Sequence, residues 1–290
     1  MSDSPIAPIQ RVTVLGSGVL GSQIAFQAAF HGFDVTAYDV SDDAVAAAGP
    51  RFEQLVGVYE HDRVKGSENG GARAALDRIL LTADLGDAVK EADLVIEAVP
   101  ESLDIKRDLY EKLAGVAPEH TIFATNSSTL LPSDLKSFTG RPTRFLALHY
   151  ANHVWQQNTA EVMGTTDTDP AVYEAVVDFA RRSGLEPIEI KKEKAGYVLN
   201  SLLVPLLNAA AGLLLEGVAD PATVDKTWRI GTGAPLGPFQ IFDVIGLTTA
   251  YNVSVASPDE GSQYFAAYLK ENYIDKGKLG TATGEGFYVY

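Results

Sequence analysis

The chain has 290 residues, 46% of them hydrophobic, and its 23 basic and 38 acidic side chains give a formal net charge of −15. This length and composition predict a globular protein with one large and one smaller domain. The negative charge disfavours nucleic acid and anionic membranes, because no basic block offsets it. The absence of cysteine excludes disulfides, thiolate catalysis and cysteine-based zinc sites.

Two segments bear on location. Residues 1–8 lack the basic and apolar stretches of a signal peptide, so we expect a cytoplasmic protein. Residues 198–215 approach the length and apolarity of a membrane span, but Asn200, Pro205 and Asn208 interrupt them. We therefore expect a buried or interface helix there and no membrane partner.

A strand-like run at 12–15 leads into a glycine-rich loop and then into a helical pattern at 23–30. This G-x-G-x-x-G join presents backbone N–H groups and the positive end of a helix dipole, which suit a pyrophosphate. It predicts a dinucleotide cofactor. The predicted cofactor-binding residues of the loop are Gly16, Gly18, Val19, Leu20 and Gly21.

A second strand-like run, 34–38, ends at Asp39. An acidic side chain about 20 residues beyond the glycine loop typically accepts hydrogen bonds from the adenosine ribose hydroxyls. No Arg or Lys stands between Asp39 and Arg51, so we expect nothing nearby to bind a 2′-phosphate. The pattern therefore predicts NAD rather than NADP.

The alternation of helix and strand continues to about residue 190. A helix begins at Asp42, and residues 51–79 indicate a helix-turn-helix excursion broken by the glycine-rich segment 66–71. Helices are predicted near 105–114 and 170–183, and further strands at 79–82, 93–99, 121–125, 144–148, 160–163 and 186–190. Short strands that are apolar on both faces predict an α/β fold with a doubly wound, mostly parallel Rossmann-type sheet over residues 1–190.

From Lys191 onward the pattern is helical, and no alternating strands appear. Pro221, Pro238 and Pro258 are typical helix-starting residues. We predict an all-α C-terminal domain over residues 191–290, joined to the first domain through the charged linker 191–194.

Among the five histidines, His149 follows an apolar strand, at the edge where open α/β sheets bind ligands. The imidazole of histidine, as a residue type, can exchange a proton with a hydroxyl or carbonyl group near neutral pH. Glu161, in the next predicted strand, is a candidate to orient the imidazole, although spacing alone leaves this open. His149 and His153 have the spacing of a helical metal pair but follow a strand without a partner glutamate, so we expect no metal site.

The segment 125–129, Thr-Asn-Ser-Ser-Thr, closes another strand. It offers amide and hydroxyl contacts to a nicotinamide or a substrate carbonyl. An ordinary turn that caps the next helix explains it equally well.

Eight short motifs along the chain are shared, in the same order, with one protein family. They are 16–21, 92–101, 125–128, His149 with Asn152, Glu161, 194–200, 233–239 with Asp243, and 279–288. In their order they resemble the 3-hydroxyacyl-CoA dehydrogenase family, specifically the short single-polypeptide members that include 3-hydroxybutyryl-CoA dehydrogenase.

The resemblance implies that His149 removes the proton from a substrate 3-hydroxyl as hydride leaves for the nicotinamide, while Glu161 holds the imidazole. It further implies that Ser128 and Asn200 bond the reacting oxygen or its neighbours. The residues implied to contact the nicotinamide half of NAD are Glu101, Lys106 and Asn126. The helical domain is expected to close the substrate cleft and form most of a homodimer.

The chain departs from this family in two places. Where the family commonly reads His-Phe-Phe-Asn-Pro, this chain has Ala151 and His153, followed by Trp155. The excursion, which helps carry CoA in relatives and is usually lysine-rich there, has fewer basic residues. Those present are Arg51, Arg63, Lys65, Arg73 and Arg78.

We therefore expect an NAD-dependent enzyme of fatty acid metabolism that interconverts short-chain L-3-hydroxyacyl-CoA and 3-oxoacyl-CoA. A CoA substrate is expected despite the sparse positive charge. Two alternatives stay open at this point: a dehydrogenase of a free hydroxy acid or sugar acid, and a non-catalytic NAD-binding or structural relative.

Overall fold

The computed structural model describes residues 6–290, and the chain divides into two compact units. The first unit ends at Val198 and the second runs from Leu199 to Tyr290. The segment 191–198, which follows the last strand, thus belongs to the first unit, beyond the boundary expected at residue 190. Each unit has its own apolar core.

The first unit is built on an eight-stranded sheet with the order β3-β2-β1-β4-β5-β6-β7-β8. The strands are β1 (Arg11–Leu15), β2 (Asp34–Tyr38), β3 (Ile79–Thr82), β4 (Leu94–Glu97), β5 (Ile122–Thr125), β6 (Phe145–Tyr150), β7 (Thr159–Gly164) and β8 (Glu186–Ile190). The β6–β7 pair is antiparallel, and the other neighbours are parallel. The doubly wound, mostly parallel sheet expected from the sequence is confirmed. Its strand order reverses between β1 and β4, where such sheets bind ligands beyond the carboxyl ends of the strands.

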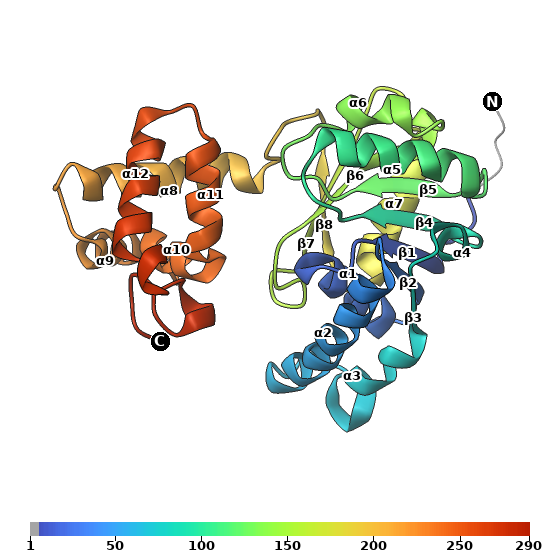
Figure 1. Cartoon of the computed structure of the whole chain (residues 1–290), viewed down its shortest axis with the longest axis horizontal. Helices are drawn as coiled ribbons and strands as arrows, with labels where there is room; N and C mark the ends of the chain where they lie inside the picture. The colour runs from blue at the N-terminus through green and yellow to red at the C-terminus, as the bar shows by residue number, and fades with distance from the viewer. Residues whose placement is uncertain (1–5) are drawn as a thin grey trace. The chain divides into compact units, whose positions relative to one another are not determined.

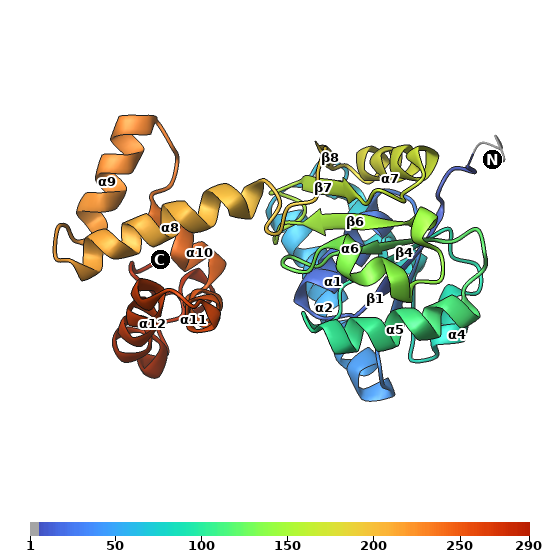
Figure 2. The same cartoon turned by 90° about the horizontal axis from the view of Figure 1, so that it is seen from above.

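Helices cover both faces of this sheet (Figures 1 and 2). One core packs α1 (Val19–Phe30), α2 (Asp42–His61) and α7 (Pro170–Arg182) against it. The other core lies under α4 (Leu85–Val89), α5 (Leu103–Val116) and α6 (Pro132–Leu135). Because both faces are covered, every residue of β4 and β5 is buried, which explains why these strands are continuously apolar apart from Glu97 and Thr125.

The excursion after β2 differs from the expected helix-turn-helix. Residues 42–61 form one helix, α2, which the Ser41 hydroxyl caps at the Ala44 N–H and which continues past Pro50. The second helix, α3 (Gly71–Ala74), is a single turn between two short 3-10 turns. Positive φ angles at Gly66, Asn69 and Gly70 interrupt the helical path between α2 and α3.

The second unit is helical, as expected from the sequence. It contains α8 (Leu199–Leu215), α9 (Pro221–Thr232), α10 (Pro238–Ile245), α11 (Leu247–Ala256) and α12 (Glu260–Asn272), labelled in Figures 1 and 2. Within residues 6–290, no helix has both the length and the apolarity needed to cross a membrane.

A buried carboxylate fastens the C-terminal segment to α10. Asp243, fully buried, accepts hydrogen bonds from the N–H groups of Phe287 and Tyr288 and from the Tyr290 hydroxyl. Glycine is required where this segment passes Asp243, because a Cβ on Gly286 would lie 2.0 Å from Oδ1 of Asp243. The glycine-rich pattern near the C-terminus therefore reflects close backbone approach to one side chain.

Candidate functional site

The glycine loop joins β1 to α1 and depends on its glycines in different ways. Gly16 has a φ of +94°, and a Cβ there would lie 2.7 Å from the carbonyl oxygen of Ala98. A Cβ on Gly21 would lie 1.8 Å from the carbonyl oxygen of Gly16. A Cβ on Gly18, by contrast, would meet no atom within 4 Å, so its backbone borders open space at the start of α1. This open cradle fits the pyrophosphate of NAD.

Asp39 follows β2 and supports the same loop. Its Oδ2 accepts hydrogen bonds from the Ser17 amide at 2.9 Å and the Ser17 hydroxyl at 2.6 Å, and its Oδ1 accepts one from the Val40 amide. Burial alone would raise the pKa of Asp39, but the Ser17 and Val40 donors, helped by the charge of Arg51, lower it instead. The carboxylate is therefore ionised where the adenosine ribose of NAD would lie.

Arg51 corrects the expectation that nothing near Asp39 would bind a 2′-phosphate. Helix α2 brings its guanidinium back to the loop, where Nη1 donates to the Ser17 carbonyl at 3.2 Å. Ser17 thus contacts an acidic and a basic side chain at once. A phosphate at this position would meet repulsion from Asp39 and attraction from Arg51.

A buried ion pair includes Lys106, one of the residues predicted to contact the nicotinamide. The Lys106 ammonium lies 2.6 Å from Glu97 Oε1 and 3.2 Å from Glu101 Oε2, and both Lys106 and Glu97 are almost completely buried. The other oxygen of Glu97 accepts a hydrogen bond from the Thr125 hydroxyl at 2.8 Å. Sequence reasoning did not select Glu97, although an acidic residue at the end of an apolar strand signals a required partner.

Glu101 connects this pair to the turn after β5. Its Oε1 accepts hydrogen bonds from the Ser127 hydroxyl at 2.5 Å and from the Thr129 amide at 2.8 Å. Burial would raise the pKa of Glu101, but the Ser127 hydroxyl, the charge of Lys106 and the Thr129 donors lower it to about 2. The polar residues at 125–129 therefore bind a carboxylate, beyond any role in capping the next helix.

A cavity of about 290 Å³ borders Glu101 and Lys106, and several other residues with predicted cofactor or substrate roles line it. Its walls are Leu20, Ala98, Val99, Glu101, Lys106, Asn126 and Ser128. The cavity lies at the carboxyl ends of β4 and β5, beside the start of α1. The structure thus brings residues predicted to bind cofactor together with the predicted substrate contact Ser128.

His149 and Glu161 face each other across the antiparallel β6–β7 pair. The His149 Nδ1 lies 2.9 Å from Glu161 Oε2, and its Nε2 lies 3.1 Å from the Ser128 hydroxyl. The second oxygen of Glu161 accepts the Val198 amide at 2.9 Å. A neutral imidazole that donates from Nδ1 to a carboxylate leaves Nε2 as the acceptor. The imidazole is therefore held at both nitrogens, with its basic atom beside Ser128.

Two further expectations concern residues outside this cluster. Asn200 is the second residue of α8 and belongs to the helical unit, so its contact with the reacting oxygen stays a prediction. Among residues 6–290, no group of three or more His, Cys, Asp or Glu side chains is arranged to hold a metal ion.

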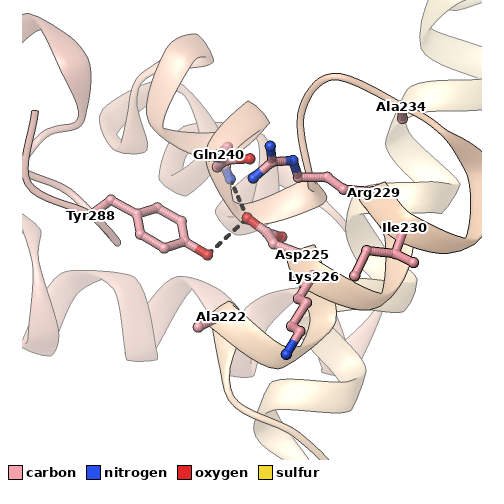
Figure 3. Close-up of a pocket in the computed structure, with 8 residues that line it drawn as sticks. All are labelled: Ala222, Asp225, Lys226, Arg229, Ile230, Ala234, Gln240 and Tyr288. Carbon is pink, nitrogen blue, oxygen red and sulfur yellow. Dashed lines mark hydrogen bonds between the residues drawn. The ribbon is translucent and has the colours of Figure 1, made fainter.

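The helical unit has a cavity of its own, of about 440 Å³ (Figure 3). Its lining residues are Ala222, Asp225, Lys226, Arg229, Ile230, Ala234, Gln240 and Tyr288. The Asp225 carboxylate accepts hydrogen bonds from the Phe239 and Gln240 amides and from the Tyr288 hydroxyl. Asp225 thereby fixes the start of α10 and the C-terminal segment to α9.

Comparison with known proteins identifies the family. The family model for the NAD-binding domain of 3-hydroxyacyl-CoA dehydrogenases matches residues 11–194, and the model for their C-terminal domain matches residues 196–290. The chain belongs to the 3-hydroxyacyl-CoA dehydrogenase family. NAD is accordingly its cofactor, as the sequence predicted, and the protein is an oxidoreductase.

Relatives of this family cover nearly the whole chain. The mitochondrial hydroxyacyl-coenzyme A dehydrogenase of Mus musculus is 33% identical over 97% of this chain and 91% of its own. A probable 3-hydroxybutyryl-CoA dehydrogenase of Bacillus subtilis is 32% identical over 97% of this chain and 98% of its own. A solved structure described for dual catalysis of dicarbonyl compounds by a diketoreductase is 69% identical, with a TM-score of 0.94 over 98% of this chain and 100% of that chain.

The low pKa of Glu101 predicts a pH-dependent contribution to stability. Because the folded-state pKa of about 2 lies below the ordinary value of 4.5, the contribution is complete above pH 4.5 and is lost as the pH falls toward 2. Thermal unfolding should show Glu101→Gln less stable than the native chain at pH 6, with the difference shrinking by pH 3. Glu111→Gln, at an exposed position of α5, is the control. A difference that is constant from pH 6 to pH 3 would contradict the assignment.

The opposed charges of Asp39 and Arg51 predict how cofactor selectivity can be changed. The native chain should bind NADH more tightly than NADPH, and Asp39→Ser should weaken NADH binding while strengthening NADPH binding by about tenfold, roughly 1.4 kcal/mol. Adding Arg51→Ala should remove that gain. Cofactor fluorescence titrations measure both affinities, with Arg63→Ala as the control for a change in charge alone. Equal NADPH affinity in the single and double variants would exclude Arg51 from this site.

Proposed function

We propose that this protein interconverts a hydroxyl and a ketone, at a carbon that stands β to a second carbonyl group, by hydride transfer to or from NAD, with His149 as the general base. The observation that carries the proposal is the Glu161–His149–Ser128 series of hydrogen bonds, whose Ser128 end lines the cavity over Glu101 and Lys106. NAD, when bound, supplies the hydride acceptor in the oxidative direction.

In that direction the His149 Nε2 removes the hydroxyl proton of the substrate as the C–H bond breaks. The Glu161 carboxylate keeps the proton of Nδ1 in place and stabilises the imidazolium that forms. The Ser128 hydroxyl, 3.1 Å from Nε2, would bond the reacting oxygen of the substrate together with His149. In the reductive direction the same imidazolium returns the proton to the ketone oxygen.

The residues on the other side of the cavity would bind the nicotinamide end of NAD. Asn126 uses its side-chain oxygen to accept the Tyr150 amide at 2.9 Å, which fixes the orientation of the side chain. Glu101 and Lys106 present a carboxylate and an ammonium that are already held by their own partners. Such fixed groups suit a carboxamide, which needs both a donor and an acceptor.

Membership of the family favours a short-chain 3-hydroxyacyl-CoA as substrate. Two features of the structure argue against CoA as the carrier of the acyl group. Of the basic residues in the excursion, Arg73 pairs with Glu53 at 2.7 Å and Arg78 pairs with Asp34 at 3.0 Å, while Arg51 faces the glycine loop. Within residues 6–290, only Arg63 and Lys65 of this set lack an ion pair or a contact with that loop.

The loop after His149 is also tied to the excursion by an acidic residue. Trp155 Nε1 and Gln156 Nε2 donate to the same Asp62 oxygen, at 2.7 Å and 2.8 Å, at the end of α2. A CoA carried over this segment would bring its phosphates toward the Asp62 carboxylate. Together with the 69% identity to a diketoreductase, this favours a small dicarbonyl compound without CoA over the acyl-CoA substrate.

The paired His149 and Glu161 argue against a non-catalytic role. A purely structural protein gains nothing from a buried carboxylate that holds a buried histidine against Ser128, a residue of the cavity wall. The cytoplasmic location and the place in fatty acid metabolism expected from the sequence stay predictions.

The proposed base predicts a loss of turnover in two variants. His149→Gln should lower kcat by about 10²-fold or more, since general acid–base assistance contributes about 10²–10⁴-fold. Glu161→Gln should lower kcat similarly through the wrong tautomer, and neither change should alter NADH affinity. His61→Gln, an exposed histidine at the end of α2, should turn over normally. Normal kcat in either site variant would remove the pair from the mechanism.

The choice of carrier predicts a ranking of substrates. The reaction is followed by NADH absorbance, and kcat/KM should be higher for acetoacetate or its ethyl ester than for acetoacetyl-CoA. Neutralising Arg63 and Lys65 together should leave kcat/KM for acetoacetate and its ethyl ester unchanged. A higher kcat/KM for acetoacetyl-CoA, with a KM that rises with salt and in this double variant, would instead establish a 3-hydroxyacyl-CoA dehydrogenase.

The helical unit predicts a homodimer built mainly on residues 191–290. It exposes large apolar side chains, and Leu202 on α8 and Ile230 on α9 have 70% and 75% of their surface accessible. Exposed apolar surface of this kind marks association. Light scattering should give twice the mass of one chain at micromolar concentration, and Leu202→Asp with Ile230→Asp should give a monomer. Val19→Asp, at an exposed site of the first unit, is the control; a monomeric native chain would contradict the prediction.

A further inference from the structure

The imidazole of His149 has an aromatic neighbour that none of the roles above uses. The ring of Tyr197 lies parallel to it, with the centroids 4.3 Å apart and the planes 10° apart. Both side chains are buried, at 1% and 5% exposure. The two in-plane nitrogens of His149 face Glu161 and Ser128, so Tyr197 covers a face of the ring that the hydrogen bonds leave uncovered.

The backbone at Tyr197 is in an unusual conformation for a side chain of this size. Its φ is +53°, in the left-handed region, which disfavours residues with a Cβ. The hydroxyl donates to the Ser127 carbonyl at 2.7 Å, so the ring is fixed at its far end. Such a conformation persists where the surrounding contacts require it, and here those contacts are at the candidate site.

Consecutive residues of this segment contact each member of the hydrogen-bonded series. The Gly196 amide donates to the Ser128 carbonyl at 3.3 Å, the Tyr197 ring stacks on His149, and the Val198 amide donates to Glu161 at 2.9 Å. Tyr197 thus lies between two residues that hydrogen-bond to Ser128 and Glu161, which a residue that only fills space does not require. The stack is therefore part of the arrangement that orients the base.

We propose that Tyr197 is a positioning residue that fixes the plane of the His149 ring and stabilises its imidazolium form through the face of the phenol. This inference rests on the proposed role of His149. An aromatic face attracts a cation within about 6 Å of its centroid, and more strongly where water is excluded. The stack consequently favours the state in which Nε2 has taken the hydroxyl proton over the neutral imidazole.

Tyr197 would act on His149 without exchanging a proton itself, as the groups around the imidazole indicate. They are the Glu161 carboxylate on β7, the Ser128 hydroxyl on the turn after β5, and the Tyr197 ring on the segment before α8. Burial raises the pKa of Tyr197, and the nearby Glu101 and Glu161 charges raise it further. Its phenol therefore stays neutral and keeps its hydrogen bond to Ser127 while His149 changes charge.

The test compares Tyr197→Phe, which keeps the ring, with Tyr197→Leu, which removes it. The carbon-bound proton resonances of His149, identified by their loss in His149→Gln, are followed by NMR against pH without substrate. In Tyr197→Leu they should lose the upfield ring-current shift, and the titration midpoint should fall by about half a unit to one unit. Tyr197→Phe should keep both properties. Tyr197→Met serves in place of Tyr197→Leu if that variant does not fold.

Kinetics and a matched control complete the test. The acid limb of the pH profile of kcat/KM should move to lower pH in Tyr197→Leu by the same amount, with kcat reduced about tenfold. Tyr173→Leu removes a tyrosine that likewise donates to a backbone carbonyl, that of Val162, and should lower only the melting temperature. A Tyr197→Leu variant with lower stability but an unchanged His149 titration would overturn the proposal. A moved titration without turnover of any 3-oxo compound would refute the proposed function and leave the stabilisation of the imidazolium supported.

Discussion

The hydrogen bond between His149 and Glu161 depends on the one antiparallel pair in the sheet. In a parallel sheet, consecutive strands need long crossovers, so neighbouring strands bring together residues that are far apart in the sequence. By reversing direction after β6, the chain sets Glu161 directly opposite His149 in the register of β6 and β7. A slip of one residue would turn the carboxylate to the other face of the sheet. The neighbouring pair in this ladder, Leu148 and Val162, holds the register because both residues are fully buried.

Carboxylates that lose contact with water need hydrogen-bond donors, and this chain of charge −15 supplies them both to buried Glu97 and to partly exposed Glu101. Glu97 has Lys106 and Thr125, and Glu101 has Ser127 and Thr129. Among the described residues, no buried side-chain nitrogen or oxygen lacks a hydrogen-bond partner. Acidic side chains thus fix loops by accepting hydrogen bonds from them, both near the predicted cofactor-binding residues and at the C-terminal segment. This explains why several polar motifs of the sequence lie at strand ends and turns.

The parts of this structure that could be predicted from sequence depend on local patterns. The β1 and β2 strands, the glycine loop and the helical second unit follow from periodicity and from the special backbone needs of glycine and proline. The position of Arg51 could not be predicted, because it depends on α2 continuing past Pro50, where a proline commonly ends a helix. The stack of Tyr197 on His149 depends on a left-handed backbone at a non-glycine residue, which propensity disfavours. Contacts that arise from such exceptions become visible only in three dimensions.

The turn at 126–129 connects the two halves of the proposed chemistry. Ser127 donates its hydroxyl to Glu101 and offers its carbonyl to the Tyr197 hydroxyl, while the next residue, Ser128, contacts His149. A displacement of Glu101 would therefore move Tyr197, which stacks on His149, and Ser128, which contacts the His149 Nε2. In the proposed reaction, these hydrogen bonds would couple the geometry of hydride transfer to that of proton transfer. The departures from the family lie in the excursion and in the loop bonded to Asp62, outside these links, so a change of substrate carrier would leave the proposed links intact.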